Sequence, residues 1–177
     1  MGLDSVEMMM AWEDAFGVAI PDHAAERMRT TRDVVDYLER QLPRNPAQPC
    51  GTQRAFHRLR TALIAVAGVP RPLVTPSSPA RELLPADHAG EAWRGVGRMV
   101  GTPRWPRFPG RLGWHPTVRD LAGRVFRSDP TAFIDPSDGW SRGNIRAVVR
   151  AIVAEEAGLA DDSFSDDASF HEDLGID

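Results

Sequence analysis

The first 43 residues carry apolar positions at the three- and four-residue spacing that is typical of amphipathic helices. Asp4 followed by Glu7 predicts a capping box, because each side chain can accept a hydrogen bond from the other residue's backbone amide. A helix is therefore expected over residues 4–16, and Gly17 is expected to end it. The spacing of three and four residues predicts that one face of this helix carries Val6, Met9, Met10, Glu13 and Phe16.

Two further helices are expected before residue 43. Ile20-Pro21-Asp22 predicts a turn that leads into a short helix over residues 22–28. Thr30 or Thr31 is expected to cap a longer helix after it. The apolar face of that helix consists of Val34, Val35, Leu38 and Leu42. Residues 44–51 are expected to form a linker.

Residues 141–177 carry one strong helical pattern and then an acidic segment. Ser141 is expected to cap a helix over residues 142–157, which Gly158 ends. Its predicted apolar face consists of Ile145, Val148, Val149, Ile152 and Val153. Phe164 and Phe170 are expected to anchor the acidic segment into a core.

Neither end of the chain buries its own apolar face, so each end needs a partner. Reading the C-terminal end before the N-terminal end gives a continuous series of helices. The motifs in that order are Ala168-Ser169-Phe170, Glu172-Asp173-Leu174-Gly175, Leu3-Asp4-Ser5-Val6-Glu7, Ile20-Pro21-Asp22 and Asp33-Val34-Val35-Asp36-Tyr37-Leu38. In this order the two ends resemble an acyl carrier protein from its first helix to its last. The resemblance implies an all-α, circularly permuted bundle formed by residues 1–43 and 141–177.

The middle of the chain carries a weaker repeat of the same pattern. Residues 52–87, shifted by ninety positions, fall on residues 142–177, so that Gly68 meets Gly158 and Leu84 meets Leu174. The segment from Thr117 to Leu121 is similar to the one around Asp33. We interpret residues 52–127 as a second, degenerate carrier-like helical bundle, followed by a linker over residues 128–140. The alternative is a chance match between two amphipathic helices with similar loops.

Charge is distributed in blocks along the chain. Residues 1–43 carry a net charge of −5 and residues 141–177 a net charge of −6, whereas residues 44–140 carry +7. All 21 basic residues are arginine. In the segment 104–111, arginines alternate with aromatic residues, as they do in proteins that bind single-stranded nucleic acid. Its prolines favour instead a connector that lays aromatic side chains on a core, so no nucleic-acid partner is expected.

Several classes of protein are disfavoured by the composition. No apolar run is long enough to span a membrane, and the acidic start of the chain does not predict an export signal. The single cysteine, Cys50, excludes an internal disulfide, and a cytoplasmic protein is expected. The five histidines lack the spacing of a metal site, and no nucleotide-binding or hydrolase motif is present.

The resemblance to acyl carrier proteins implies one modified serine at the start of the second helix of the bundle. That serine carries 4'-phosphopantetheine, whose thiol holds acyl groups as thioesters. A gap-free alignment puts Gly2 at this position in the terminal bundle and His88 in the middle one, so both bundles depart from the family there. Asp4-Ser5 recreates the Asp-Ser pair one helical turn later, which makes Ser5 the candidate attachment site.

Two functions remain open. The first is a non-enzymatic acyl carrier, loaded at Ser5 by a phosphopantetheinyl transferase and serving enzymes of fatty acid, polyketide or related thioester metabolism. The second is a pseudo-carrier adaptor that docks partner enzymes without carrying a substrate. Either function would use the acidic helix that contains Asp4, Glu7, Glu13 and Asp14, because these acids would attract basic partners. The chain is expected to be a monomer or a domain-swapped dimer.

Overall fold

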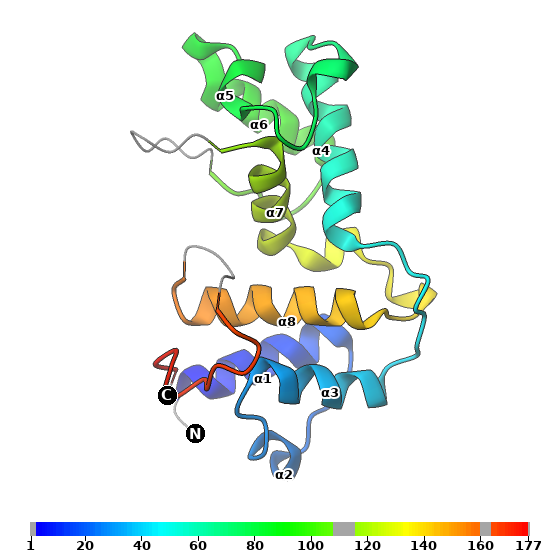
Figure 1. Cartoon of the computed structure of the whole chain (residues 1–177), viewed down its shortest axis with the longest axis vertical. Helices are drawn as coiled ribbons and strands as arrows, with labels where there is room; N and C mark the ends of the chain where they lie inside the picture. Colours follow the sequence, from blue (N-terminus) through cyan, green and yellow to red (C-terminus); the bar gives the residue numbers. More distant parts are fainter. Residues whose placement is uncertain (1–2, 108–115, 160–163, 177) are drawn as a thin grey trace. The chain divides into compact units, whose positions relative to one another are not determined.

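The computed structural model describes residues 3–107, 116–159 and 164–176, and the regular secondary structure of these residues is entirely helical (Figure 1). The predicted all-α fold is therefore confirmed. The chain divides into two compact units. Unit 1 combines Met1–Gln48 with Ile134–Asp177, and unit 2 is Pro49–Phe133. Within the described residues, every helix is too short or too polar to cross a lipid bilayer.

Unit 1 is built from helices of both chain ends. The N-terminal end supplies α1 (Leu3–Phe16), α2 (Asp22–Ala25) and α3 (Thr31–Gln41), and the C-terminal end supplies α8 (Arg142–Glu156). Helix α8 packs against both α3 and α1, and Figure 1 shows it beside them. Residues more than one hundred positions apart in the sequence therefore share one core.

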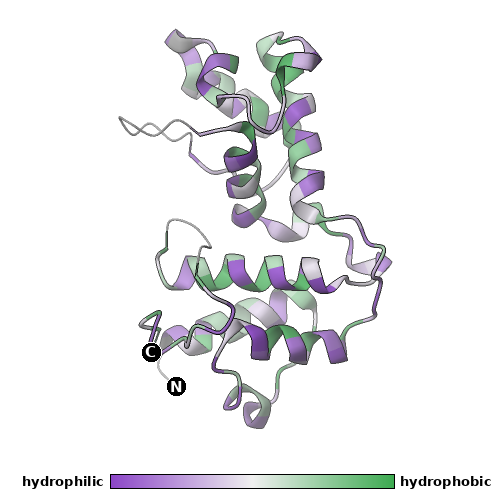
Figure 2. Cartoon of the chain, viewed as in Figure 1, coloured by the Kyte–Doolittle hydropathy of each residue, from purple (hydrophilic) through white to green (hydrophobic). Residues whose placement is uncertain are grey.

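The predicted faces of α3 and α8 form most of this core. On α3, Val34, Val35, Leu38 and the following Leu42 are all buried, as expected. Figure 2 shows hydrophobic and hydrophilic residues interleaved along both helices. Thr30 caps α3 in a capping box with Asp33, and the Ser141 hydroxyl caps α8 by accepting from the Asn144 amide. Of the apolar face predicted for α8, Ile145, Val148, Val149 and Val153 are buried and Ile152 is half-buried.

The start and the buried face of α1 differ from the prediction. The helix begins at Leu3, so Asp4 lies within its first turn and is not the N-cap residue. There its carboxylate is favoured by the helix dipole without capping it. The buried stripe consists of Met8, Trp12 and Phe16, whereas Val6 and Met10 are 41% and 57% exposed. The run Met8-Met9-Met10 is compatible with several helical faces, and the large Trp12 side chain determines which one is buried.

Helix α2 is shorter than predicted, ending at Ala25 instead of residue 28. After Ala25 the backbone tightens into turns, in which Arg27 donates to the Ala24 carbonyl and Met28 to the Ala25 carbonyl. The Arg29 carbonyl then accepts from the Phe170 amide, at 2.9 Å. The C-terminal segment thus binds the backbone that follows these turns.

Hydrogen bonds join the two segments of unit 1 that lead to the rest of the chain. The Trp140 amide donates to the Pro43 carbonyl at 2.7 Å, and the Asn45 amide donates to the Trp140 carbonyl at 2.8 Å. The buried Gln48 accepts from the Asn144 side chain and donates to the Asp135 carbonyl. Residues expected to be linker, including the short 3-10 helix η4 (Pro136–Asp138), are therefore part of the structure of unit 1.

Unit 2 is a second helical bundle. Its main helices are α4 (Gly51–Ala67), α6 (Ala89–Val100) and α7 (Val118–Ser128), and α4 packs against both of the others. The shorter elements are η1 (Arg71–Leu73), α5 (Ala80–Leu83), η2 (Ala86–His88) and η3 (Pro130–Phe133). The core of unit 2 contains Leu59, Leu63, Val96, Leu121 and Val125, which are fully buried.

A set of backbone contacts recurs in the two units. A capping box between Thr30 and Asp33 begins α3, and one between Thr117 and Asp120 begins α7. An isolated antiparallel bridge joins Thr30 to Ser169 in unit 1 and Thr117 to Pro79 in unit 2. In unit 1 the Phe170 amide donates to the Arg29 carbonyl, and the Arg32 amide donates to the Asp166 carbonyl. In unit 2 the Ala80 amide donates to the Pro116 carbonyl, and the Arg119 amide donates to the Pro76 carbonyl. Residues 76, 79 and 80 lie ninety positions before 166, 169 and 170, which is the shift of the sequence repeat.

The arginine- and aromatic-rich connector lays a tryptophan on the core of unit 2, as its prolines suggested. The Trp105 ring lies 4.6 Å from that of the buried Trp93, measured between centroids. The Trp105 indole donates to the Trp93 carbonyl, and the Trp93 indole donates to the Pro106 carbonyl. Phe108 of the same segment lies outside the described residues.

Gly97 is expected to be required for this contact. A Cβ atom at Gly97 would lie 2.7 Å from atoms of the Trp105 ring. We predict that Gly97→Ala displaces Trp105 and lowers the free energy of unfolding by roughly 1–3 kcal/mol, measured by urea denaturation.

Gly90→Ala is the matched control, because a Cβ atom at Gly90 of the same helix meets no atom within 4 Å. It should leave stability unchanged or raise it by up to about 1 kcal/mol through helix propensity. Equal stability of the two variants would contradict a structural role for the Trp105 contact.

Candidate functional site

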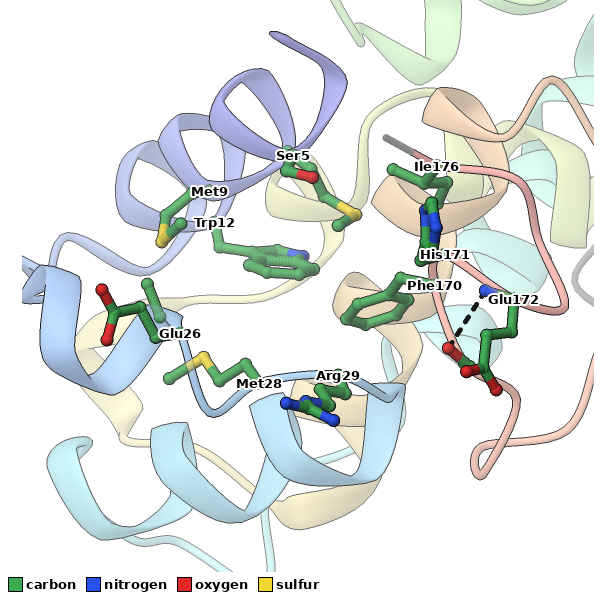
Figure 3. A pocket seen from close by; sticks show the side chains of 13 residues that line it. Ser5, Met9, Trp12, Glu26, Met28, Arg29, Phe170, His171, Glu172 and Ile176 are labelled. Atoms are coloured by element: carbon green, nitrogen blue, oxygen red, sulfur yellow. Dashed lines mark hydrogen bonds between the residues drawn. The ribbon is translucent and has the colours of Figure 1, made fainter. Parts of the chain in front are cut away.

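A pocket of about 260 Å³ lies in unit 1 beside the N-terminal half of α1 (Figure 3). Three segments enclose it, namely α1, residues 25–29 and the C-terminal residues 169–176. Its apolar lining includes Met8, Met9, Trp12, Phe170 and Ile176, and its polar lining includes Ser5, Glu26, Arg29, His171 and Glu172. The pocket therefore combines an apolar interior with several groups that can form hydrogen bonds.

Ser5 lines this pocket from the first turns of α1. It is the third residue of the helix and is half-buried. Helical spacing puts it on the same side as Met8 and Met9, one turn further along, and Figure 3 shows its hydroxyl beside the pocket. The first turn of a helix has backbone amides without helical partners and the positive end of the helix dipole, so it favours a phosphate group.

The C-terminal segment contacts α1 through an aromatic pair, and hydrogen bonds within the segment fix its own conformation. The Phe170 ring lies 5.8 Å from the Trp12 ring. The Ile176 amide donates to the Phe170 carbonyl at 2.8 Å, and the Glu172 amide donates to the Ser169 hydroxyl at 3.2 Å, drawn in Figure 3. Gly175 adopts a positive φ of 69°, which the turn toward Ile176 requires.

Two arginines of α8 fix the loop that precedes this segment. The buried Arg150 donates to the Phe164 carbonyl at 2.7 Å and lies over the Phe164 ring. Arg150 and Arg146 both form ion pairs with Asp166. Partial burial raises the pKa of Asp166, but the hydrogen bonds from Arg146 and Arg150 outweigh it, and the net pKa is below its ordinary value. These contacts position the residues that enclose the pocket.

Acidic side chains surround the junction of α1 and α8. Desolvation raises the pKa of Glu156 at the end of α8, and the charges of Glu7, Glu155 and Asp4 raise it further. Repulsion between these carboxylates destabilises the folded unit. The same surface would attract a basic protein.

The candidate docking acids occupy different environments along α1. Asp4, Glu7 and Asp14 are exposed. The Glu13 carboxylate accepts a hydrogen bond from the Ile20 amide at 2.6 Å, so it stabilises the loop after the helix. Helix α1 thus brings Asp4, Ser5 and Glu7 together at its start and gives Glu13 a structural contact.

The two positions that align with the serine of carriers lie elsewhere. Gly2 is outside the described residues. His88 is exposed, ends η2 and immediately precedes α6, so it occupies the start of a helix in unit 2.

Sequence reasoning missed the pocket and the side chains at its base. Trp12 was not assigned to any face, although Met8, Trp12 and Phe16 have the four-residue spacing of a helical stripe. Within the described residues, the buried Trp12 indole N–H has no hydrogen-bond partner. The polar groups Glu26, Arg29 and His171 come from separate segments, and no local sequence signal joins them.

Comparison with known proteins identifies an acyl-carrier-like region. The chain is similar to an acyl carrier protein of Thermosynechococcus vestitus, with 50% identity over 40 residues. The match covers 23% of this chain and 49% of that protein, so the chain spans about half the length of the curated relative that it matches. No protein-family model and no solved structure matches the chain.

The ion pairs of Asp166 predict that the free energy of unfolding depends on pH in the acidic range. Because the pKa of Asp166 is lower in the folded state than its ordinary 3.8, its stabilisation is complete above that value and is lost as the pH falls through the folded pKa. Asp166→Asn should therefore lower the free energy of unfolding at neutral pH and flatten its decline below about pH 4.

Thermal unfolding of both proteins across this pH range would measure the effect. Asp22→Asn is the control, because the Asp22 side chain has no hydrogen bond or ion pair within the described part of the chain. If Asp166→Asn retained the full acid dependence of the wild type, the ion pairs of Asp166 with Arg146 and Arg150 would not be its source.

Glu156 is predicted to lower the stability of the fold at neutral pH, whereas Asp166 raises it. Since folding raises its pKa above the ordinary 4.5, ionised Glu156 destabilises the fold above the folded pKa, and this penalty disappears as the pH falls through that value. Glu156→Gln should raise the melting temperature at neutral pH, and the gain should vanish in acid. Glu155→Gln, at an exposed neighbour, should give a smaller gain, and equal gains would contradict this assignment.

Proposed function

We propose that this chain is an acyl-carrier-like protein that carries acyl groups as thioesters on a 4'-phosphopantetheine attached to Ser5. The observation that carries the proposal is the position of Ser5, in the first turns of a 14-residue helix and at the edge of a pocket lined by Met8, Trp12 and Phe170. The similarity to an acyl carrier protein supports a carrier rather than an enzyme.

A short repeat at the two chain ends supports Ser5 over Gly2. Gly175-Ile176-Asp177 ends the chain, and Gly2-Leu3-Asp4 nearly begins it. If these tripeptides are treated as equivalent, Ser5 follows an Asp-Leu-Gly-Ile-Asp motif directly and completes the Asp-Ser pair of carriers. The gap-free alignment, which counts both tripeptides, is what moves the position to Gly2.

The residues around Ser5 fit the attachment of a phosphodiester. The amides of the first turn of α1 lack helical acceptors and would stabilise its charge. Met8, Met9 and Phe170 offer apolar surface beside the arm. When attached, the arm supplies the thiol that forms the thioester. Glu7 and Asp14, exposed on α1, would guide a phosphopantetheinyl transferase and biosynthetic enzymes.

The second candidate function is a pseudo-carrier adaptor that docks enzymes without a cofactor. The half-burial of Ser5 favours it, because a transferase needs access to the hydroxyl. Ser5 also has an interaction within the protein. In this case the acidic face of α1 would be the functional surface.

We further propose that unit 1 is a permuted carrier fold and unit 2 a degenerate copy of it. The recurrent bridge and capping boxes support the repeat, since Thr30 pairs with Ser169 and Thr117 with Pro79. The shared core of α8 with α1 and α3 supports the permutation. Unit 2 has His88 before α6 where a carrier would have its serine, so we expect no attachment there.

Modification of Ser5 decides between the two functions. Co-expression with a broad-specificity phosphopantetheinyl transferase should increase the intact mass by one phosphopantetheine, and Ser5→Ala should abolish the increase. Peptide mapping should locate the group at Ser5.

Ser165→Ala is the matched control, because Ser165 is an exposed serine of the same unit and should not affect loading. An unmodified wild type, under conditions that load an ordinary carrier fully, would exclude the carrier function and leave the adaptor. Circular dichroism of Ser5→Ala would show that the fold is retained.

A further inference from the structure

The two units carry opposite net charges. Unit 1 contains 20 acidic residues and eight arginines, a net charge of −12. Unit 2 contains five acidic residues and thirteen arginines, a net charge of +8. A carrier-like bundle with a strongly positive surface would repel the basic partners that an acidic carrier attracts. An acidic partner would suit the charge of unit 2 instead.

Part of the positive charge of unit 2 lies on one surface, which we call the α6 face. It consists of Arg94, Arg98 and Met99 on α6 together with Arg104 and Arg107 in the connector that follows. All four arginines are exposed, and Met99 is 54% exposed. Glu91, the one acidic residue of α6, lies three and seven residues before Arg94 and Arg98 and therefore on the same side of the helix, where the arginines outnumber it. The face thus combines an excess of positive charge with an exposed apolar side chain.

The arginines of the α6 face are without polar partners in the described part of unit 2. Within the described residues, the side chains of Arg94, Arg98, Arg104 and Arg107 form no hydrogen bond or ion pair. The position of the connector is nevertheless fixed, because Trp105, between Arg104 and Arg107, packs on Trp93. Arginines of unit 1, by contrast, are paired with acids, as in Arg32–Asp167, Arg142–Glu39 and Arg146–Asp166.

Helix α1 presents the complementary surface, which we call the α1 face. Its outer side carries Glu7, Met10 and Asp14, which are all exposed, and Met10 is 57% exposed. Successive spacings of three and four residues place these side chains on one stripe, opposite the buried Met8 and Trp12. Within the described part of the chain, Glu7 and Asp14 form no ion pair.

We propose that the α6 face of one copy of this protein docks onto the α1 face of a second copy. Arginines of one copy meet carboxylates of the other, and the exposed Met99 and Met10 lie at the edge of this contact, where their flexible side chains adapt to the neighbouring surface. The proposed assembly is a dimer that is held by two reciprocal contacts of this kind. The dimer covers the acids assigned to partner enzymes, so partners compete with self-association. None of these steps requires modification of Ser5.

Sedimentation velocity of the full chain tests the proposal. The wild type should show a concentration-dependent shift from monomer to dimer at low salt. The dissociation constant should rise by about tenfold or more between about 0.05 M and 0.5 M salt, because exposed charges are screened over a few ångströms at the higher value. The double variant Arg94→Glu with Arg98→Glu should remain monomeric at concentrations where the wild type is dimeric.

A charge-reversal rescue and a matched control sharpen the test. Glu7→Arg with Asp14→Arg should also abolish the dimer, and all four substitutions in one chain should restore it. Arg71→Glu with Arg119→Glu changes the net charge equally at exposed arginines on η1 and α7, and should leave the dimer intact. Circular dichroism would confirm that each variant is folded.

Three results would overturn the proposal. The first is a wild type that stays monomeric at every concentration. The second is a dimer that withstands high salt and the Arg94→Glu, Arg98→Glu pair, which would indicate exchange of helices between copies instead. The third is that the chain with all four charge-reversal substitutions does not regain association. The mass gain at Ser5 is independent of all three, so failure of the carrier function and failure of this contact are distinguishable.

Discussion

Unit 1 depends on the packing of α8 between elements from the other end of the chain. The side chains of Ile145, Val148 and Val149 on α8 are fully buried and need apolar partners. Helices α1 and α3 supply those partners. Because this contact spans most of the sequence, the entropy of closing the long intervening segment opposes it. The pocket beside Ser5 exists only after it forms, since residues from both ends line that pocket.

Polar contacts then convert this apolar association into a defined site. Arg150 and Arg146 hold Asp166, and the Asp166 carbonyl accepts from the Arg32 amide. That single loop therefore contacts both α8 and α3. The bridge between Thr30 and Ser169 follows directly, and it sets the register of Phe170 against Trp12. In unit 2 an equivalent bridge forms where Pro76 replaces the acid, so the backbone pattern does not require the ion pairs.

The sequence predicted α3 and α8 well because each has one unambiguous apolar face and a hydroxyl residue at its start. Thr30 and Ser141 both cap as expected. Helix α1 was predicted less well for the opposite reason, since three consecutive methionines fit several faces and only tertiary packing selects Met8. The site was predictable as far as the Asp4-Ser5 pair. The pocket was not, because its lining joins three segments through contacts that no local pattern encodes.

Helix α1 is subject to three demands that act on different sides of it. Its inner side supplies Met8 and Trp12 to the core, and its first turn holds Ser5 beside the pocket. On its outer side Glu7 and Asp14 form no ion pair within the described residues, although repulsion from Glu7 adds to the desolvation that raises the pKa of Glu156 and so opposes folding. A basic residue in place of Glu7 would remove its repulsion of Glu156 and stabilise unit 1. The proposed partner contact instead uses the acids on the outer side of α1, so Glu7 would favour binding while it opposes folding.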